Sequence, residues 1–435
     1  MSRGAVCGSA ARRSVAERGL PPIGMATKRW EESRAGEVDQ AAVQELLVLQ
    51  SEEECELPDP VKLTRGWRTW GLEPDTFALL HAKEYELMRW IQRVPGLLPF
   101  SLGVHYSLLP KVITPALALI VWLSSFPRGA SLIIFVCAND CLNTAIKWAV
   151  QRPRPRWYCP IEANGLIDSC GAWEVDLSFP SAHTMFFAGL AACSAALYGI
   201  PHWISFAFGA GVGISRNYLS MHWPTDTMMG LALGGILGFV WGWADPYAFL
   251  LAKASPVLSL LAASGFTLGL LCLMVATRQL VPPVASTERT VWFANALQSL
   301  SAEEREATLA SKQKQLKPRN LKSKVPMLVS VWAPLAMTGI YPYVLPHVGT
   351  LPQGTAVSRL VQAGVGVVGL GFIAALKTFV GDLGPLFAPP GSKRRKFAEG
   401  RKGQLKALTY VAICAWTFLL SQMVGERLLG LPWRS

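Results

Sequence analysis

The sequence predicts an all-α protein built as a polytopic bundle of transmembrane helices. Apolar residues make up 51% of the 435 residues and charged residues only 16%, and the mean hydropathy is positive. The apolar residues form long runs, several of which are long enough to cross a hydrocarbon core of about 30 Å. Short stretches marked by proline or glycine separate the runs, as is typical of loops between membrane spans.

Nine segments have the length and composition of membrane spans. They cover residues 106–126, 130–149, 183–200, 202–219, 226–245, 256–277, 326–346, 357–380 and 404–425. The stretch before them, residues 76–101, contains six charged or histidine side chains among its apolar residues. We therefore expect an amphipathic helix that lies at the membrane interface there.

Composition divides the chain into five parts. Residues 1–75 form a polar tail, which we expect to be disordered because its composition cannot supply an apolar core. The interfacial helix over 76–101 follows. After it come a first membrane block over 102–277, a basic polar linker over 278–325 and a C-terminal transmembrane block over 326–435.

The formal net charge of +12 lies mainly outside the predicted spans. The basic runs at 311–324 and 393–402 flank apolar segments and show no regular interleaving with aromatic residues, so we expect no nucleic-acid partner. Contact with anionic membrane lipids explains them, as does the tendency of cytosolic loops to be basic. The nine cysteines are scattered, with no C-x-x-C pair and no Cys/His grouping at zinc spacing.

Three short polar segments interrupt the first membrane block. They contain Lys147 and Arg154; Ser181, Ala182 and His183; and Arg216, His222 and Asp226. Taken singly, such residues also serve as basic anchors at span ends, as helix N-caps or as packed histidines. The order of the predicted spans, however, brings all three segments to one face of the membrane. Anchoring alone does not account for that convergence.

The basic members of this set are suited to binding a phosphoryl group. The guanidinium groups of Arg154 and Arg216 offer forked donors, and Lys147 adds a point charge. Ser181 and the backbone N–H groups of Ala182 and His183 add further donors at a helix start. Because basic side chains supply the positive charge, no metal or other cofactor is expected.

The two histidines and the aspartate suit phosphoryl transfer. If the segment from His222 to Asp226 is helical, the four-residue spacing places the carboxylate over the imidazole, which leaves one ring nitrogen free to attack phosphorus. His183 is then available to protonate the leaving alkoxide and afterwards to activate water. We therefore expect a phosphohistidine intermediate.

At these residues the chain resembles the type 2 phosphatidic acid phosphatase (PAP2) superfamily. Its motifs are a Lys and an Arg-Pro separated by six residues, a Pro-Ser-Gly-His-like turn, and Ser-Arg, five residues, His, three residues, Asp. The spacings match here, with Ala182 where glycine is more usual. The resemblance implies a PAP2-type six-helix catalytic core over 102–277 with additional C-terminal spans. It also assigns the family roles to the residues named above.

Within that superfamily the chain is most similar to the sphingosine-1-phosphate phosphatase group. The features shared are the Arg-Pro-Arg-Pro run at 152–155, the Phe-Pro-Ser-Ala-His-Thr turn, and spans after the catalytic block. This implies a multi-pass endoplasmic reticulum enzyme acting on long-chain base phosphates, with other endomembranes, the plasma membrane or a plastid membrane as alternatives. Phosphatidate, lysophosphatidate, prenyl diphosphate and glucose-6-phosphate remain alternative substrates, and an inactive scaffold or a lipid transporter is the rival class.

The side of the membrane that the site faces is open to two interpretations. Counting spans forward from Asp226 places the basic linker on the catalytic face, which favours a cytosolic site. The family resemblance instead implies a luminal site, which we favour. A luminal loop would allow Cys159 and Cys170 to form a disulfide.

Overall fold

The structure is a computed structural model, and it describes residues 74–107, 126–158, 165–167, 174–284, 286–298, 300–310 and 321–344. Their regular structure consists of helices, with no strand in these ranges. The predicted all-α class is confirmed. The tail to residue 73, Cys159, Cys170 and the segments predicted to span at 357–380 and 404–425 lie outside the described residues, as does most of 106–126.

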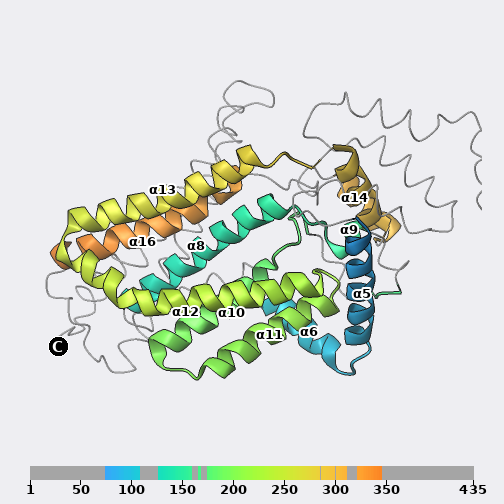
Figure 1. Ribbon diagram of the computed structural model, residues 1–435, viewed down its shortest axis with the longest axis horizontal. Helices are drawn as coiled ribbons and strands as arrows, with labels where there is room; N and C mark the ends of the chain where they lie inside the picture. Colours follow the sequence, from blue (N-terminus) through green and yellow to red (C-terminus); the bar gives the residue numbers. More distant parts are fainter. Residues whose placement is uncertain are drawn as a thin grey trace, which may run out of the picture.

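The helices follow one another with short connections. They are α5 (Pro74–Gln92), α6 (Leu97–Ser107), α8 (Phe126–Val150), α9 (Pro155–Tyr158), α10 (Ala182–Tyr198), α11 (His202–Tyr218), α12 (Pro224–Ala254), α13 (Pro256–Leu280), α14 (Ser286–Gln298), α15 (Ala302–Ala310), η3 (Leu321–Lys324) and α16 (Val325–Val344). The long helices run alongside one another, and α5 stands across one end of the bundle (Figure 1).

Three helical segments in the described part are long and apolar enough to cross a membrane: Arg128–Tyr158, Pro224–Asp245 and Pro256–Leu280. They coincide with three of the predicted spans. The predicted spans at 183–200, 202–219 and 326–346 coincide with α10, α11 and α16. The apolar stretches of α10 and α16 are shorter, at Ala182–Tyr198 and Met327–Ala336. The chain is a membrane protein.

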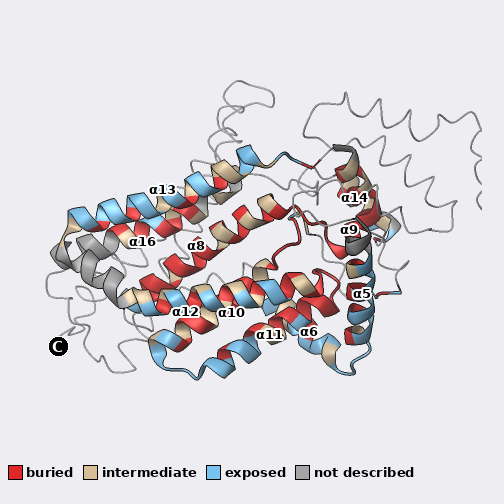
Figure 2. Ribbon diagram, viewed as in Figure 1, coloured by how far each residue is buried: buried red, intermediate tan, exposed pale blue. Residues whose placement is uncertain are grey.

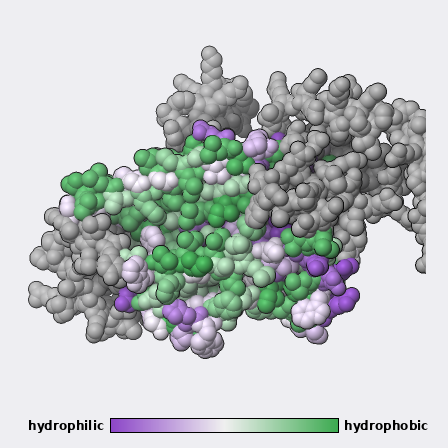
Figure 3. Space-filling model, in the orientation of Figure 1, coloured by the Kyte–Doolittle hydropathy of each residue, from purple (hydrophilic) through white to green (hydrophobic). Residues whose placement is uncertain are grey.

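The outer surface of the long helices is apolar. Large side chains of α12 and α13 are turned outward, with Trp243 66% exposed and Leu261 64% exposed. Exposed faces of both helices are visible in Figure 2, and apolar side chains spread over the bundle in Figure 3. A continuous apolar surface of this kind is suited to lipid rather than to water.

Glycines on α12 allow the closest helix packing in the bundle. Gly230, Gly234, Gly238 and Gly242 recur at every fourth residue and face α10. A Cβ atom added at Gly234 would lie 2.2 Å from the carbonyl oxygen of Met185, and one at Gly238 would lie 2.1 Å from that of Gly189. Small residues at this spacing let two backbones approach within a membrane. The contact fixes the start of α10 beside the start of α12.

Two segments predicted to be peripheral contribute to the packed interior. α5, in the predicted interfacial stretch, buries His81, Glu84 and Met88 against the end of the bundle. α14, in the predicted polar linker, buries Trp292 and Phe293 in the largest apolar cluster, together with side chains of α8, α13 and α16. Both helices are amphipathic, and both have their apolar face covered.

The glycine packing predicts that alanine substitutions at two neighbouring positions differ sharply in their effect on thermal stability. Gly234→Ala should lower the thermal stability of the detergent-solubilised protein, because the new methyl group overpacks the α10 contact at a cost of about 1–3 kcal/mol. Gly235→Ala is the matched control, because no heavy atom lies within 4 Å of its added Cβ. Equal melting temperatures for the two variants in a size-exclusion thermal assay would contradict this packing.

Candidate active site

The site forms where the ends of four helices meet. Lys147 lies in the last turn of α8 and Arg216 in the last turn of α11, while Ser181 caps α10 and Asp226 lies in the first turn of α12. All four are buried. The structure therefore brings the three polar segments of the sequence to one end of the bundle.

The Asp226 carboxylate is surrounded by donors. Its Oδ1 atom lies 2.8 Å from Arg152 Nη1, and its Oδ2 atom accepts from Trp223 N at 3.1 Å and from the Ser178 hydroxyl. The backbone carbonyl of Asp226 accepts a 3.0 Å hydrogen bond from Ser181 N. The carboxylate is fully buried, and these contacts supply the partners that a buried charge requires.

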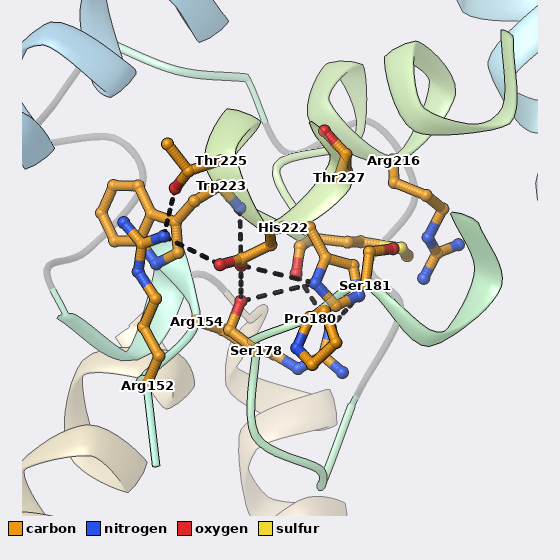
Figure 4. A network of polar contacts seen from close by, with 12 residues as sticks. Arg152, Arg154, Ser178, Pro180, Ser181, Arg216, His222, Trp223, Thr225 and Thr227 are labelled. Carbon is orange, nitrogen blue, oxygen red and sulfur yellow. Dashed lines mark hydrogen bonds and ion pairs between the residues drawn. The ribbon is translucent and has the colours of Figure 1, made fainter. Parts of the chain in front are cut away.

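Figure 4 shows His222 close to Arg154 and Ser178. Its Nε2 atom is 3.2 Å from Arg154 Nη1, and its Nδ1 atom is 3.4 Å from Ser178 Oγ and 3.6 Å from Asp226 Oδ2. A guanidinium group can only donate, so Nε2 is the acceptor and the ring proton is assigned to Nδ1. The Nε2 lone pair thus points toward Arg154.

The relation of His222 to Asp226 differs from the one expected for a helical segment. His222 precedes α12, which begins at Pro224, and Asp226 accepts from the Trp223 N–H as a helix-capping residue. The 3.6 Å separation is longer than a hydrogen bond. Ser178 instead contacts both groups, because its hydroxyl donates to Asp226 and lies near His222 Nδ1.

The surroundings keep His222 neutral. Burial, with Arg154, Lys147 and Arg216, holds the pKa of His222 well below its ordinary value. Glu174 opposes this change by raising the pKa, but its effect is smaller. A neutral imidazole whose Nε2 atom carries a lone pair rather than a proton is the form required of a nucleophile.

The cationic groups are held by backbone carbonyls and by one carboxylate. Lys147 Nζ donates to the carbonyl of Leu177, and Arg154 donates to the carbonyl of Asp176 at 2.6 Å and to that of Met221 at 2.8 Å. Arg216 Nη1 lies 3.0 Å from His105 Nδ1. Carbonyl oxygens carry no formal charge, so the backbone contacts do not neutralise these side chains.

Glu174 occupies the position between the two arginines. Its carboxylate lies 3.0 Å from Arg216 Nη2 and 3.6 Å from Arg154 Nη2, and its side chain is 26% exposed. Burial raises the pKa of Glu174, but Arg154 and Arg216 outweigh it and hold the pKa of this carboxyl well below its ordinary range. An anion therefore already sits where the basic groups converge.

The start of α10 completes the site. Ser181 Oγ accepts from Thr184 N at 3.4 Å and from the Thr184 hydroxyl at 3.0 Å, as a helix N-cap does. Ala182 and His183 form the first turn and are half-buried. His183 lies two residues after the Ser181 cap, at the same end of α10.

Sequence reasoning missed four residues of this centre. They are Glu84, Arg152, Glu174 and Ser178. Arg152 belongs to the Arg-Pro-Arg-Pro run, but motif spacing selects Arg154. Glu84 shares the buried face of α5 with His81 and Met88. An acidic residue on the same helix face as apolar residues is a pattern from which its burial could have been predicted. Glu174 and Ser178 lie in an irregular segment and carry no signal of that kind.

Within the described ranges, no three His, Cys, Asp or Glu side chains are grouped so that they could hold a metal ion. The cationic side chains instead form a site for an anion, and they converge at one end of a bundle of apolar helices. Fold and site together define a helical membrane protein with an anion-binding centre.

Comparison with known proteins identifies the domain that carries this centre. Residues 128–249 match the PAP2 superfamily, so the chain contains a PAP2 superfamily domain. Members of this superfamily are phosphatases, and the match supports a phosphatase activity. The bacitracin transport permease protein BcrC of Bacillus licheniformis is 25% identical over 156 residues, which cover 34% of this chain and 76% of that protein. No solved structure matches the chain.

The position of Glu174 predicts competition with anions. Glu174→Gln should strengthen competitive inhibition by inorganic phosphate by roughly tenfold, the factor that corresponds to about 1.4 kcal/mol, because a neutral amide pairs less well with two arginines. Glu174 is ionised throughout the neutral range, so the gain should persist at each pH in that range.

The matched control is Glu174→Asp, which retains the negative charge. Its inhibition constant for phosphate should stay closer to that of the original protein. Unchanged or weaker phosphate inhibition of Glu174→Gln would show that the carboxylate does not occupy the phosphate position.

Proposed function

We propose that the protein is a membrane phosphatase that hydrolyses the phosphate monoester of a lipid through a phosphohistidine intermediate. The observation that carries the proposal is the approach of Arg154 to the Nε2 atom of a neutral, buried His222. A nucleophile and an anion-binding group therefore meet at one point. The site lies at one end of a bundle of apolar helices, which favours a substrate held in the bilayer.

In the first step the phosphate replaces the Glu174 carboxylate between Arg154 and Arg216. His222 Nε2 attacks phosphorus, and the bond from phosphorus to the ester oxygen breaks. His183 gives its proton to that oxygen, so the alcohol leaves neutral. The cationic groups stabilise the charge on the equatorial oxygens, as electrostatic catalysis of phosphoryl transfer requires.

In the second step water hydrolyses the phosphohistidine. His183, now without its proton, accepts a proton from the attacking water, and the bond from phosphorus to Nε2 breaks. Lys147 remains beside the anion throughout. Because Ser181 is the acceptor in both of its contacts with Thr184, its own hydroxyl proton can be donated to the bound phosphate.

Asp226 and Ser178 keep the His222 ring in the reactive tautomer. The Nδ1 proton faces the Ser178 hydroxyl, which itself donates to Asp226. The carboxylate therefore acts on the imidazole both directly, across 3.6 Å, and through the hydroxyl. As the ring becomes positively charged during attack, the nearby carboxylate stabilises it.

The substrate that we propose is a long-chain base phosphate such as sphingosine-1-phosphate, in the endoplasmic reticulum membrane with the site facing the lumen. The resemblance of the motif residues supports this assignment. Phosphatidate, lysophosphatidate, prenyl diphosphate and glucose-6-phosphate are the alternatives. Purified protein in lipid vesicles should release phosphate fastest from the long-chain base phosphate. Faster release from soluble glucose-6-phosphate would contradict the lipid assignment.

His222→Ala should abolish both turnover and the covalent intermediate. We expect a loss of roughly a thousandfold or more, because the nucleophile is removed. Acid-quenched protein incubated with radiolabelled substrate should carry label in the original protein and none in the variant. Label retained on the variant would assign the nucleophile to another residue. Correct membrane insertion of the variant is the control.

His183→Ala should affect substrates according to their leaving group. Loss of the general acid should slow hydrolysis of an alkyl phosphate by roughly 10²–10⁴-fold. An activated aryl phosphate, such as p-nitrophenyl phosphate, has a leaving group that needs no proton. Formation of the phosphohistidine from this ester should therefore slow much less. Equal losses in pre-steady-state bursts for the two esters would exclude the general-acid role.

A further inference from the structure

A row of buried ion pairs extends from the site to α5. Arg152 forms one ion pair with Asp226 at 2.8 Å and a second with Glu84. The three side chains are buried, with exposed fractions of 2%, 0% and 4% for Arg152, Asp226 and Glu84. Arg152 therefore divides its positive charge between two carboxylates.

The surroundings fix Arg152 in this position. Its guanidinium lies 4.9 Å from the ring centroid of Trp223, and the Trp223 indole donates to the carbonyl of Pro153 at 2.8 Å. His81 of α5 stacks on the same Trp223 ring, with ring centroids 4.4 Å apart. Glu84 also accepts from the backbone N–H of Thr225 at 3.1 Å.

Glu84 lies outside the segment that matches the PAP2 superfamily, which begins at residue 128. It nevertheless reaches the first turn of α12, through Thr225, and the segment that follows α8, through Arg152. Tyr85, its neighbour on α5, donates to the carbonyl of Pro155 at 3.0 Å. α5, which precedes the PAP2 domain, therefore contacts both the segment after α8 and the start of α12.

We propose that Arg152 and Glu84 are positioning residues that set how much negative charge Asp226 presents to His222. The inference rests on the proposed function, because it assigns these residues a role in tuning the nucleophile. Arg152 offsets the charge of Asp226, and Glu84 in turn limits how far Arg152 does so. Neither residue is expected to touch the substrate.

The proposal makes opposite predictions for the two residues. Without Arg152, Asp226 would act on His222 with its full charge and favour the imidazolium form. Without the Glu84 charge, Arg152 would offset Asp226 more completely and disfavour that form. Lys147, Arg154, Arg216 and Glu174 also act on His222, and His81 interacts with Arg152 and Asp226. Both substitutions leave these groups in place.

The test is the pH dependence of kcat/KM for the full chain in lipid vesicles. In Arg152→Gln the acid limb should move to higher pH by roughly one pH unit, the change typical of a neighbouring charge. In Glu84→Gln it should stay in place or move to lower pH. In both variants kcat should fall, while the inhibition constant for inorganic phosphate should change little, because the phosphate-binding groups are untouched.

Two further variants separate charge from structure. Glu86→Gln removes an exposed acid from the same helix and should match the original protein in pH profile and kcat. Arg152→Lys keeps the charge and should keep the original acid limb, even if Arg152→Gln fails to fold. An upward shift in Arg152→Lys or in Glu84→Gln would overturn the proposal, as would an unshifted limb in folded Arg152→Gln.

Failure of the proposed function would look different. In that case the original protein would release no phosphate from any phosphorylated lipid, and no phosphohistidine would be trapped. If the enzyme is active and its phosphohistidine is trapped, but the acid limb does not shift in Arg152→Gln, only the positioning role is contradicted.

Discussion

A fully buried carboxylate must find partners, and Asp226 draws those partners from separate parts of the chain. Arg152 comes from the segment after α8, Ser178 from the connection before α10, and Trp223 directly precedes α12. The carbonyl of Asp226 also accepts from Ser181 at the start of α10. Because an unpaired charge here would be strongly destabilising, satisfying Asp226 assembles the site.

Helix packing makes that assembly possible at the end of a lipid-exposed bundle. Apolar side chains give little driving force between helices within a bilayer, so close backbone contact has to supply the attraction. The glycines at 230, 234 and 238 provide this contact between α10 and α12. Ser181 and Asp226 stand at the starts of these helices, and the same packing brings them together.

Much of the fold and part of the site can be predicted from the sequence. Long apolar runs identify α8, α12 and α13, because a membrane span requires a minimum length. The alternation of spans across a membrane places Lys147 and Arg216 at the same end. The spacing of Gly230, Gly234 and Gly238 was also readable, as a helix-packing pattern.

The remaining features depend on tertiary contacts that sequence spacing does not encode. Glu84 meets Arg152 only because α5 folds across the end of the bundle. Ser178 reaches Asp226 and His222 from an irregular segment, whose path no periodicity defines. His222 precedes α12 rather than lying within it, because the helix begins after Trp223, whose N–H donates to Asp226. The sequence motifs identify the residues that are expected to act on the substrate. They omit the residues that hold those side chains in position.

The cationic groups around His222 are proposed to form a phosphate site that Glu174 now occupies. A structure determined with orthovanadate, which mimics the transferring phosphoryl group, tests it most directly. We expect vanadate between Arg154 and Arg216, with vanadium opposite His222 Nε2 and the Glu174 carboxylate displaced. Vanadate bound elsewhere, or bound while Glu174 still bridges the two arginines, would contradict it.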